Sequence, residues 1–338
     1  MTPALLPELE ELERIIALGA SRLEVTSIAA SGPDGLPVYM IALGNKSREA
    51  GGVGFFGGVH GLERIGAQVV IAFLGGLVAR LPWDSTLQRQ LEHVRLVFMP
   101  LVNPGGMLRH TRANMNGVDL MRNAPVDAQD AVPFLVGGQR ISAGLPWYRG
   151  RLGDPMQPES AALCALVERE LHGRPFSLAL DCHSGFGMRD RIWFPHAHRR
   201  SPIAHLAQLH ALHGIFQDSN SHHPYMFEPQ SAQYLAHGDL WDHLCLRAAE
   251  RAGTVFLPLT LEMGSWLWVK KNPRQLFSRR GIFNPLIAHR QQRVLRRHLP
   301  LLDFAVRAAG AWPLWMPQGP DIEAHRLAAM ARWYAMPA

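Results

Sequence analysis

Short apolar runs alternate along the chain with longer segments in which apolar residues recur at the spacing of a helix. Five of the runs have the length and composition of strands buried on both faces of a sheet, and they span 36–44, 51–58, 94–102, 176–183 and 254–262. Helical spacing covers 5–19, 64–80, 159–172, 201–214, 239–252 and 285–309. Strands that alternate with helices predict an α/β fold, so we expect a mixed, mostly parallel sheet with helices on both faces.

Two long stretches between these elements, 103–158 and 184–238, are rich in Gly, Pro, Arg, His and Asn. Long irregular segments inside a compact domain are uncommon and often carry function. The last stretch, 311–338, contains three tryptophans and early prolines. We expect residues 1–310 to form a single catalytic domain and residues 311–338 to form a C-terminal extension packed on it.

Polar side chains stand at the carboxyl ends of four predicted strands. His60 and Glu63 follow one strand, Asn103 follows another, and His183 and Glu262 end two more. In open α/β sheets, ligands bind at the edge where the strands end. The sequence therefore predicts a functional site at this edge.

The chain has 338 residues, of which 47% are hydrophobic, and a formal net charge of +6. Part of the positive charge lies in one segment, "HRQQRVLRRHL" (289–299). A basic helix of this kind can contact nucleic acid or a membrane surface, but a solvated helix face is the simpler interpretation. We expect no nucleic-acid and no membrane partner, while the basic balance suits a small anionic substrate through electrostatic steering.

The cysteines and the N-terminus both favour the cytoplasm. The three cysteines, Cys164, Cys182 and Cys245, lie far apart, which fits a reducing compartment better than a disulfide scaffold. The first residues lack the positive start and apolar core of a signal peptide. The longest uncharged apolar run, 65–79, is too short to span a bilayer comfortably, and we interpret it as a buried helix.

A catalytic zinc site uses three protein ligands drawn from His, Glu and Asp and keeps one position open. His60 and Glu63 can supply two of them, because the bend between a strand end and a helix start turns both side chains to one point. His183, at a distant strand end and followed by small residues, is the natural third. The pair alone is a weak signal in a chain with 17 histidines. "HAH" (196–198) and "SHH" (221–223) could bind a second metal, but we interpret them as loop histidines near the site.

The segment "NPGGMLRHTRANMNGVDLMRN" (103–123) strengthens this prediction, because with its flanking motifs it resembles the zinc metallocarboxypeptidase family, the carboxypeptidase A-like enzymes. In that family a His-x-x-Glu pair precedes an Asn-Pro turn, an arginine, a Gly-Val-Asp-x-x-Arg-Asn segment, a strand-end His-Ser and a catalytic glutamate. This chain carries the same order in His60 and Glu63, Asn103-Pro104-Gly105, Arg112, 117–123, His183-Ser184 and Glu262. The resemblance covers residues 35–310.

The resemblance implies one Zn²⁺ ion held by His60, Glu63 and His183. It implies that Asp119 accepts the second ring N–H of the first zinc histidine and fixes its tautomer. Glu262 would be the general base, which takes a proton from the attacking water and returns it to the leaving amine. Arg112 would stabilise the oxyanion of the tetrahedral intermediate.

On the substrate side, the resemblance implies that Arg122 holds the substrate carboxylate with its planar guanidinium. Tyr234 is similar to the family's mobile tyrosine, which closes over that carboxylate, and Leu240 falls where the family's specificity pocket is lined. One departure is Met121, which stands where the family usually has an asparagine. The loss of this amide donor predicts weaker or different carboxylate recognition.

The resulting prediction is zinc-dependent hydrolysis of an amide bond next to a free carboxylate in a small peptide or acyl-amino acid. "RANMNGVDL" (112–120) is closer to the bacterial murein-peptide amidase branch than to the digestive enzymes. An N-acyl amino acid deacylase of the succinylglutamate desuccinylase or aspartoacylase type would share the zinc site. The segment 112–123, however, resembles the corresponding motif of the peptidases. Retention of Glu262 speaks against a binding protein that has lost catalysis.

Overall fold

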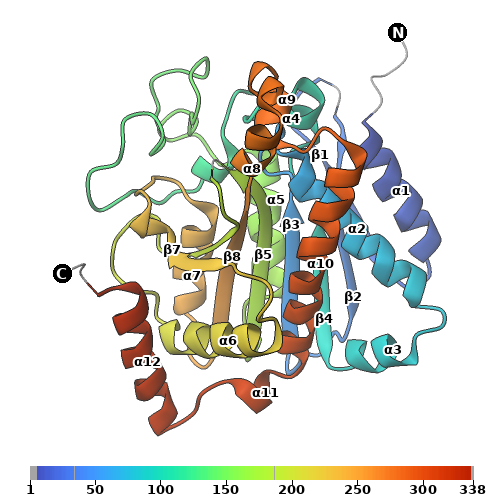
Figure 1. The fold of residues 1–338 in the computed structure, drawn as a ribbon, viewed down its shortest axis with the longest axis vertical. Coiled ribbons are helices and arrows are strands. Elements are labelled where there is room, and N and C mark those ends of the chain that lie inside the picture. Colours follow the sequence, from blue (N-terminus) through green and yellow to red (C-terminus); the bar gives the residue numbers. More distant parts are fainter. Residues whose placement is uncertain (1–5, 34, 186, 336–338) are drawn as a thin grey trace.

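The computed structural model describes residues 6–33, 35–185 and 187–335, and it contains an eight-stranded sheet (Figure 1). The spatial order is β1-β2-β4-β3-β5-β8-β6-β7, and the strands are β1 (Glu24–Ala29), β2 (Pro37–Gly44), β3 (Gly51–Gly57), β4 (Val94–Met99), β5 (Phe176–Gly185), β6 (Arg191–Phe194), β7 (Met226–Pro229) and β8 (Val255–Gly264). The central run β4-β3-β5-β8 and the pair β6-β7 are parallel. The pairs β1-β2, β2-β4 and β8-β6 are antiparallel, so the sheet is mixed as predicted.

Helices cover both faces of this sheet. They are α1 (Pro7–Gly19), α2 (Arg64–Arg80), α3 (Ser85–Leu91), α4 (Pro104–Arg109), α5 (Pro158–Glu170), α6 (Leu206–Ser219), α7 (Leu240–Ala249), α8 (Trp266–Lys271), α9 (Arg279–Phe283), α10 (Ala288–Gly310), α11 (Trp312–Trp315) and α12 (Pro320–Trp333). Successive strand residues point to opposite faces, so Phe55 packs in the core shared with α1, α2, α6 and α10, whereas Phe56 packs in the core shared with α5 and α7. The α/β fold with helices on both faces is confirmed.

The strands that the sequence did not predict are β1, β6 and β7. β6 and β7 have only four residues each, and β1 exposes most of its side chains, so none of them forms an apolar run. The helix predicted at 201–214 begins later, at Leu206, and continues to Ser219, because residues 201–205 form a turn and Phe216 extends the buried stripe. The other predicted helices lie within a few residues of their expected positions.

The C-terminal segment packs on the rest of the chain through α12, which lies against α6. The ring of Trp333 contacts Phe194 edge to face, with centroids 5.1 Å apart, and its indole N–H donates to the carbonyl of Phe227 at 2.9 Å. Residues 336–338 of the predicted extension lie outside the described residues.

The apolar run at 65–79 lies in α2, which packs against β3, β5, α1 and α10. Taken one at a time, none of the helices in the described residues has both the length and the apolarity needed to cross a membrane. α2 and α3 meet these limits only together, and the chain bends by 112° between them.

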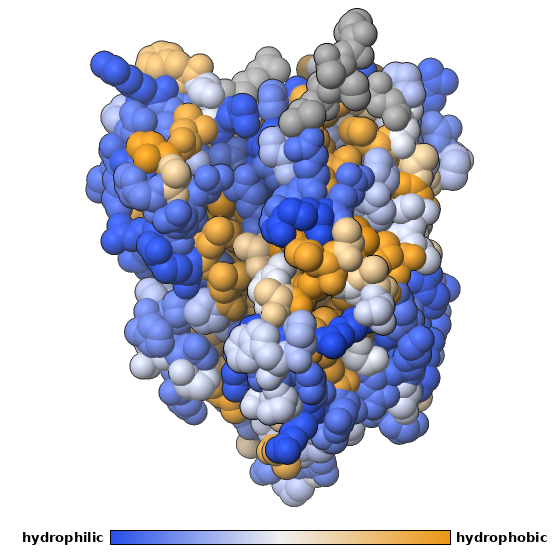
Figure 2. All heavy atoms as spheres, turned by 90° about the vertical axis from the view of Figure 1, so that its right-hand side faces the viewer, coloured by the Kyte–Doolittle hydropathy of each residue, from blue (hydrophilic) through white to orange (hydrophobic). Residues whose placement is uncertain are grey.

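The face over α1, α2 and α10 carries an apolar patch within a hydrophilic surround (Figure 2). A hollow of about 560 Å³ between α2 and α10 lies on this side, lined by apolar residues such as Phe73 and Leu299 and flanked by Arg296. Arg290, Arg293 and Arg297 of the same helix line a different hollow. The basic residues of α10 therefore point in two directions.

The start of α2 touches the end of β5 at Gly66. A methyl group at this residue would overlap the carbonyl oxygen of Cys182. This close approach brings Glu63, the residue before α2, beside His183, and the amide N–H of Ser184 donates to the Glu63 carboxylate at 2.9 Å. Only glycine at position 66 allows α2 to approach β5 closely enough to place Glu63 beside His183.

Replacing Gly66 with alanine should lower the free energy of unfolding by at least about 2 kcal/mol, because the helix must move away from β5. Gly76 in the same helix is the matched control, since no described atom lies within 4 Å of the position that its methyl group would take. Gly76→Ala should be neutral or stabilise the fold by about 0.5–1 kcal/mol. Denaturant unfolding of both variants checks this, and equal effects would contradict the role given to the contact.

Candidate active site

The polar residues at the strand ends converge as predicted. His60 follows β3, Glu63 precedes α2, and His183 and Glu262 occupy paired positions on the parallel strands β5 and β8. One nitrogen of each histidine and one carboxylate oxygen of Glu63 lie within 4.8 Å of one another. Parallel strands end at the same edge of a sheet, so a short turn after each is enough to bring these groups together.

Three of these residues, His60, Glu63 and Glu262, border a cavity of about 360 Å³. His60, Glu63, Arg112, Tyr234 and Glu262 all contribute to its lining. Aromatic and cationic side chains form half of the remaining wall, namely Trp147, Arg189, Arg191, Trp193 and Phe283. The cavity is large enough for a short peptide end and carries several donors for an anion.

The three candidate ligands fit a zinc ion. All three side chains are buried. Two ligands each bound to one zinc in tetrahedral geometry lie about 3.4 Å apart. Nδ1 of His183 and Oε2 of Glu63 are 3.1 Å apart, which is close to this value. Two imidazoles and one carboxylate are also a donor set typical of catalytic zinc.

The sequence reasoning missed Asp181, which orients His183. Its Oδ2 lies 2.7 Å from Nε2 of His183 and accepts the indole N–H of Trp241 at 2.9 Å. The imidazole proton therefore sits on Nε2, which leaves Nδ1 facing Glu63. Although burial opposes it, the carboxylates of Asp181 and Glu63 raise the pKa of His183 well above its usual value, and the same negative surroundings favour a bound cation. The available signal was the Asp-x-His spacing, since residues two apart on a strand share a face.

Arg112 links the other side of the site. Its Nη2 lies 2.7 Å from Nε2 of His60, and its Nε donates to Oδ2 of Asp119 at 2.7 Å. A guanidinium only donates, so Nε2 of His60 accepts and the ring proton lies on Nδ1. A zinc ion held by His60 would therefore take the place of the Arg112 guanidinium at Nε2. Nδ1 of His60 lies 3.5 Å from Oδ1 of Asp119, so Asp119 lies beside His60 as expected. The shorter hydrogen bonds of the Asp119 carboxylate, however, are accepted from Arg112 and from the backbone N–H of Met121. Burial and the adjacent Arg112 lower the pKa of His60 well below its usual value.

Glu262 points toward the ligand group. Burial, together with the nearby Glu63 carboxylate, raises its pKa to about 7. Its Oε2 has no hydrogen-bond partner among the described residues. A side chain at Gly185 would meet this oxygen, so the glycine keeps space for it. A carboxylate that holds a proton near neutral pH and keeps a free oxygen is suited to general acid–base chemistry.

The residues expected to bind the substrate carboxylate lie deeper than predicted. Tyr234 lines the cavity, and its hydroxyl accepts a hydrogen bond from Nη2 of Arg122 at 3.2 Å. Arg122, Met121 and Leu240 do not line the cavity, so their contact with the substrate stays a prediction. The cause is the packing of the short helix η1 (Leu120–Arg122) against α7, which buries Met121 and Leu240 in the core of that face. Arg122 is covered on the cavity side by Tyr234.

The short strand β6 supplies wall residues that the sequence reasoning missed. Arg191 lies opposite Glu262 in the antiparallel pair β6-β8, so both side chains share a face of the sheet. Arg191 is paired with Glu228 of β7, and Trp193 packs edge to face on Tyr234 with ring centroids 6.1 Å apart. The alternation in "RIWF" (191–194) was the available signal.

A second group of possible ligands, His196, His198 and Asp242, lies elsewhere in the fold. Nδ1 of His198 is 2.5 Å from Oδ2 of Asp242, which is shorter than the separation of about 3.4 Å expected for two ligands of one ion. The same carboxylate accepts the backbone N–H groups of Ala197 and His198, and Arg199 lies 3.1 Å from Nε2 of His196. We therefore interpret this group as a hydrogen-bonded cluster that anchors the loop, and not as a metal site.

An α/β sheet whose strand ends present two histidines, a glutamate and a carboxylate of raised pKa has the components of a metal-dependent hydrolase. A profile of the zinc carboxypeptidase family matches residues 10–250, which is well over half of the chain. The chain belongs to the zinc carboxypeptidase family.

Individual relatives agree with this assignment. The chain is similar to Carboxypeptidase SOL1 of Arabidopsis thaliana, with 30% identity over 95 residues, which make up 27% of this chain and 19% of that protein. The match thus spans about a fifth of the length of this curated relative. Among solved structures, thrombin activatable fibrinolysis inhibitor has a TM-score of 0.65 at 18% identity, covering 88% of this chain and 72% of that chain. Carboxypeptidase A from Helicoverpa armigera has a TM-score of 0.65 at 17% identity, covering 89% and 71%. At these identities the structural likeness establishes the fold.

Metal analysis distinguishes the two histidine groups. His183→Gln should remove most of the bound metal, whereas His198→Gln should leave the metal content at one ion per chain and lower the melting temperature, because Asp242 loses a charge-assisted partner. Elemental analysis after dialysis, with a thermal melt of each variant, makes the comparison. A loss of metal in His198→Gln of the same size as in His183→Gln would contradict the assignment.

Proposed function

We propose that the protein is a zinc-dependent peptidase or amidase that cleaves an amide bond next to a free carboxylate, with one Zn²⁺ held by His60, Glu63 and His183. One observation supports this above all others. His60, Glu63 and Glu262 share a cavity with Tyr234, whose hydroxyl accepts a hydrogen bond from Arg122, and His183 lies directly behind Glu63, with Nδ1 3.1 Å from Oε2. Hydrolytic groups and a carboxylate-binding cation thus lie within reach of one small substrate.

Zinc in such a site lowers the pKa of water to about 7 and polarises the scissile carbonyl. Glu262 takes the proton of the attacking water on its unpaired oxygen and delivers it to the leaving nitrogen. Arg112, which reaches the cavity with its guanidinium, donates to the oxygen that becomes negative during attack. Asp181 and Asp119 hold His183 and Arg112 in place.

Arg122 recognises the free carboxylate of the substrate after Tyr234 moves aside or shares the anion with it. The guanidinium centre lies 5.9 Å from the tyrosine ring, and Asp239 lies 3.9 Å from Nη1. Met121 provides no amide donor here, so the anion depends on Arg122, Tyr234 and the cationic wall. This favours substrates whose carboxylate differs in position from that of an ordinary C-terminal residue, and γ-D-glutamyl-diaminopimelate peptides are one such class.

A hydrolysis panel on the zinc-loaded protein tests the proposal. It contains C-terminal dipeptides with blocked N-termini, γ-D-glutamyl-diaminopimelate peptides and N-acyl amino acids, each also as the C-terminal amide. Cleavage of one of the first two classes, with loss of activity on the amide form, supports the proposal. Activity confined to N-acyl amino acids would overturn it in favour of a deacylase.

Glu262→Gln should lower kcat by at least about 100-fold while the metal stays bound, because the amide cannot accept the proton of the attacking water. The measurement is steady-state hydrolysis of the best panel substrate, with metal content as the control. Turnover equal to that of the parent protein would remove Glu262 from the mechanism.

The pH dependence of kcat/KM reports the ionisation of the Glu262 carboxylate. Glu262 acts as a base only when ionised, so kcat/KM should fall as pH decreases through its pKa. Burial and Glu63 raise this pKa from 4.5 to about 7, while a bound divalent cation opposes the rise. The acid limb of the profile should therefore lie above 4.5 and no higher than about 7. A profile that stays flat from pH 4.5 to 7 would contradict this.

A further inference from the structure

A second cavity, of about 310 Å³, opens beside the catalytic one and carries an excess of positive charge. Lys271, Arg290, Arg293 and Arg297 contribute to its lining, together with a single carboxylate, Asp190. That carboxylate is already engaged. Its Oδ2 lies 2.6 Å from Nε of Arg297, and its Oδ1 accepts the backbone N–H of Gly264 at 2.8 Å. Lys271, Arg290 and Arg293 therefore find no free carboxylate among the residues that line this cavity.

The sequence around this cavity is unusual in its charge. Residues 263–302 contain nine lysines and arginines and no aspartate or glutamate, whereas the whole chain has a net charge of only +6. The rest of the chain is therefore slightly acidic, and the positive charge is concentrated in α8, α9, α10 and the turns between them. Concentration of this kind creates a local positive potential that attracts anions.

Within the described part of the chain, Lys271, Arg290 and Arg293 form no ion pair. Nη1 of Arg290 is shielded from solvent and has no hydrogen-bond partner among the described residues. Buried donors in folded proteins almost always have an acceptor, and an unpaired one is costly. A carboxylate entering this cavity would supply the missing acceptor.

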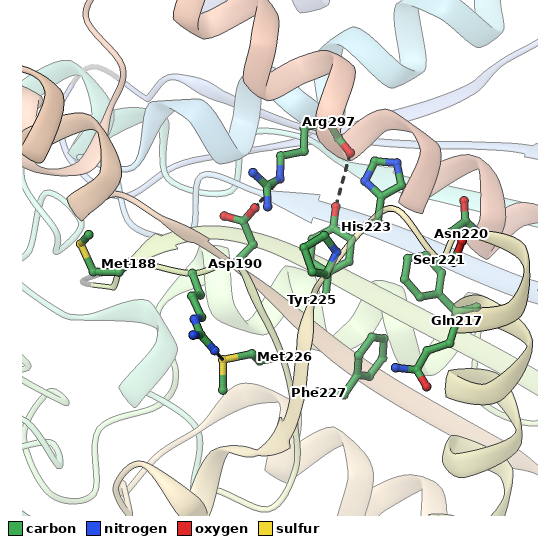
Figure 3. A pocket seen from close by; sticks show the side chains of 13 residues that line it. Met188, Asp190, Gln217, Asn220, Ser221, His223, Tyr225, Met226, Phe227 and Arg297 are labelled. Carbon is green, nitrogen blue, oxygen red and sulfur yellow. Dashed lines mark hydrogen bonds and ion pairs between the residues drawn. The ribbon is translucent and has the colours of Figure 1, made fainter.

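The basic cavity borders the catalytic one. Gly264 lines both of them. Arg189 lines the catalytic cavity and a third, larger hollow of about 650 Å³, where Asp190 and Arg297 face each other (Figure 3). Asp190 and Arg297 in turn line the basic cavity. The three cavities thus meet around the segment 187–190.

The shared rim offers a path for a bound peptide. If the terminal carboxylate lies at Arg122 and the scissile bond at the zinc ligands, the preceding residues must leave the catalytic cavity over its rim. Arg189 and Gly264 are the rim residues shared with the neighbouring cavities. Arg189 is exposed and, among the described residues, forms no ion pair, and its side chain contacts the sulfur of Met226.

We propose that Arg189, Lys271, Arg290 and Arg293, here called the cationic track, bind acidic side chains upstream of the scissile bond. The preferred substrates are then peptides with aspartate or glutamate before the cleaved residue. The inference rests on the proposed function. Most of these charges line a hollow that borders the catalytic cavity and do not lie along an open face, which favours a peptide over a nucleic acid.

The test uses two peptides with the same C-terminal residues, one with glutamates and the other with glutamines upstream. The zinc-loaded protein should cleave the glutamate peptide with a kcat/KM about tenfold higher at low salt, and the preference should shrink to about twofold at 0.5 M salt. Arg290→Gln/Arg293→Gln should lower kcat/KM for the glutamate peptide about fivefold, mainly through KM. The same variant should leave the glutamine peptide unchanged.

The matched control is Arg14→Gln/Arg326→Gln, which removes the same charge from exposed ion pairs on α1 and α12 and should change neither peptide. Equal kcat/KM for the two peptides, or an equal loss in the control variant, would overturn the proposal. An equal loss in the control variant would show that the effect comes from the net charge of the protein and not from the cationic track.

Binding to the zinc-loaded Glu262→Gln protein separates the two proposals. Fluorescence anisotropy should show tighter binding of the labelled glutamate peptide, and this preference should disappear with Arg290→Gln/Arg293→Gln. The same binding pattern without hydrolysis of any peptide by the parent protein would support the cationic track and reject the proposed function. Tighter binding of a single-stranded oligonucleotide of equal charge would reject the track as a peptide site.

Discussion

The approach of α2 to the end of β5 is the constraint on which the site depends. Gly66 has no side chain, so the first turn of α2 can rest on the carbonyl of Cys182. Glu63 is then carried to His183 and to the amide of Ser184. Asn284 secures the same turn from the other side, because its amide accepts the N–H of Ile65 and donates to the carbonyl of Leu62. Two of the three candidate ligands are thus positioned by backbone contacts, which are stiffer than side-chain packing.

The second feature is the concentration of negative charge around those ligands. Glu63, Asp119, Asp181 and Glu262 lie close together, and Arg112 is the cation that touches two of them. Burial raises the pKa of Glu262 to about 7, and repulsion from the carboxylates of Glu63 and Asp181 adds to this rise. A divalent cation relieves this repulsion, so the arrangement that strains the protein favours metal binding.

The sequence predicted what depends on local pattern and missed what depends on tertiary contact. The ends of β3, β5 and β8 could be located because buried strands form continuous apolar runs, and the polar residues that follow them marked the site. β6 and β7 are too short to form such runs, so Arg191 and Glu228 were missed. The burial of Arg122 and Leu240 could not be foreseen either, because it arises from packing between η1 and α7, which are more than 100 residues apart. Asp181 could be predicted only in part. The sequence shows its spacing of two residues from His183, but it does not show the hydrogen bond from the indole N–H of Trp241.

Charge is divided between the interior and one exterior region. The catalytic cavity gathers carboxylates that hold a cation, whereas residues 263–302 gather cations without any acidic residue. Arg189 and Gly264 stand where the two regions meet. An anionic chain is attracted by the second region and repelled by the first until a metal neutralises it. Access of such a substrate to Glu262 would therefore depend on the metal for electrostatic reasons as well as chemical ones, and this coupling follows from the placement of the charges whatever the side chain at the cleaved position.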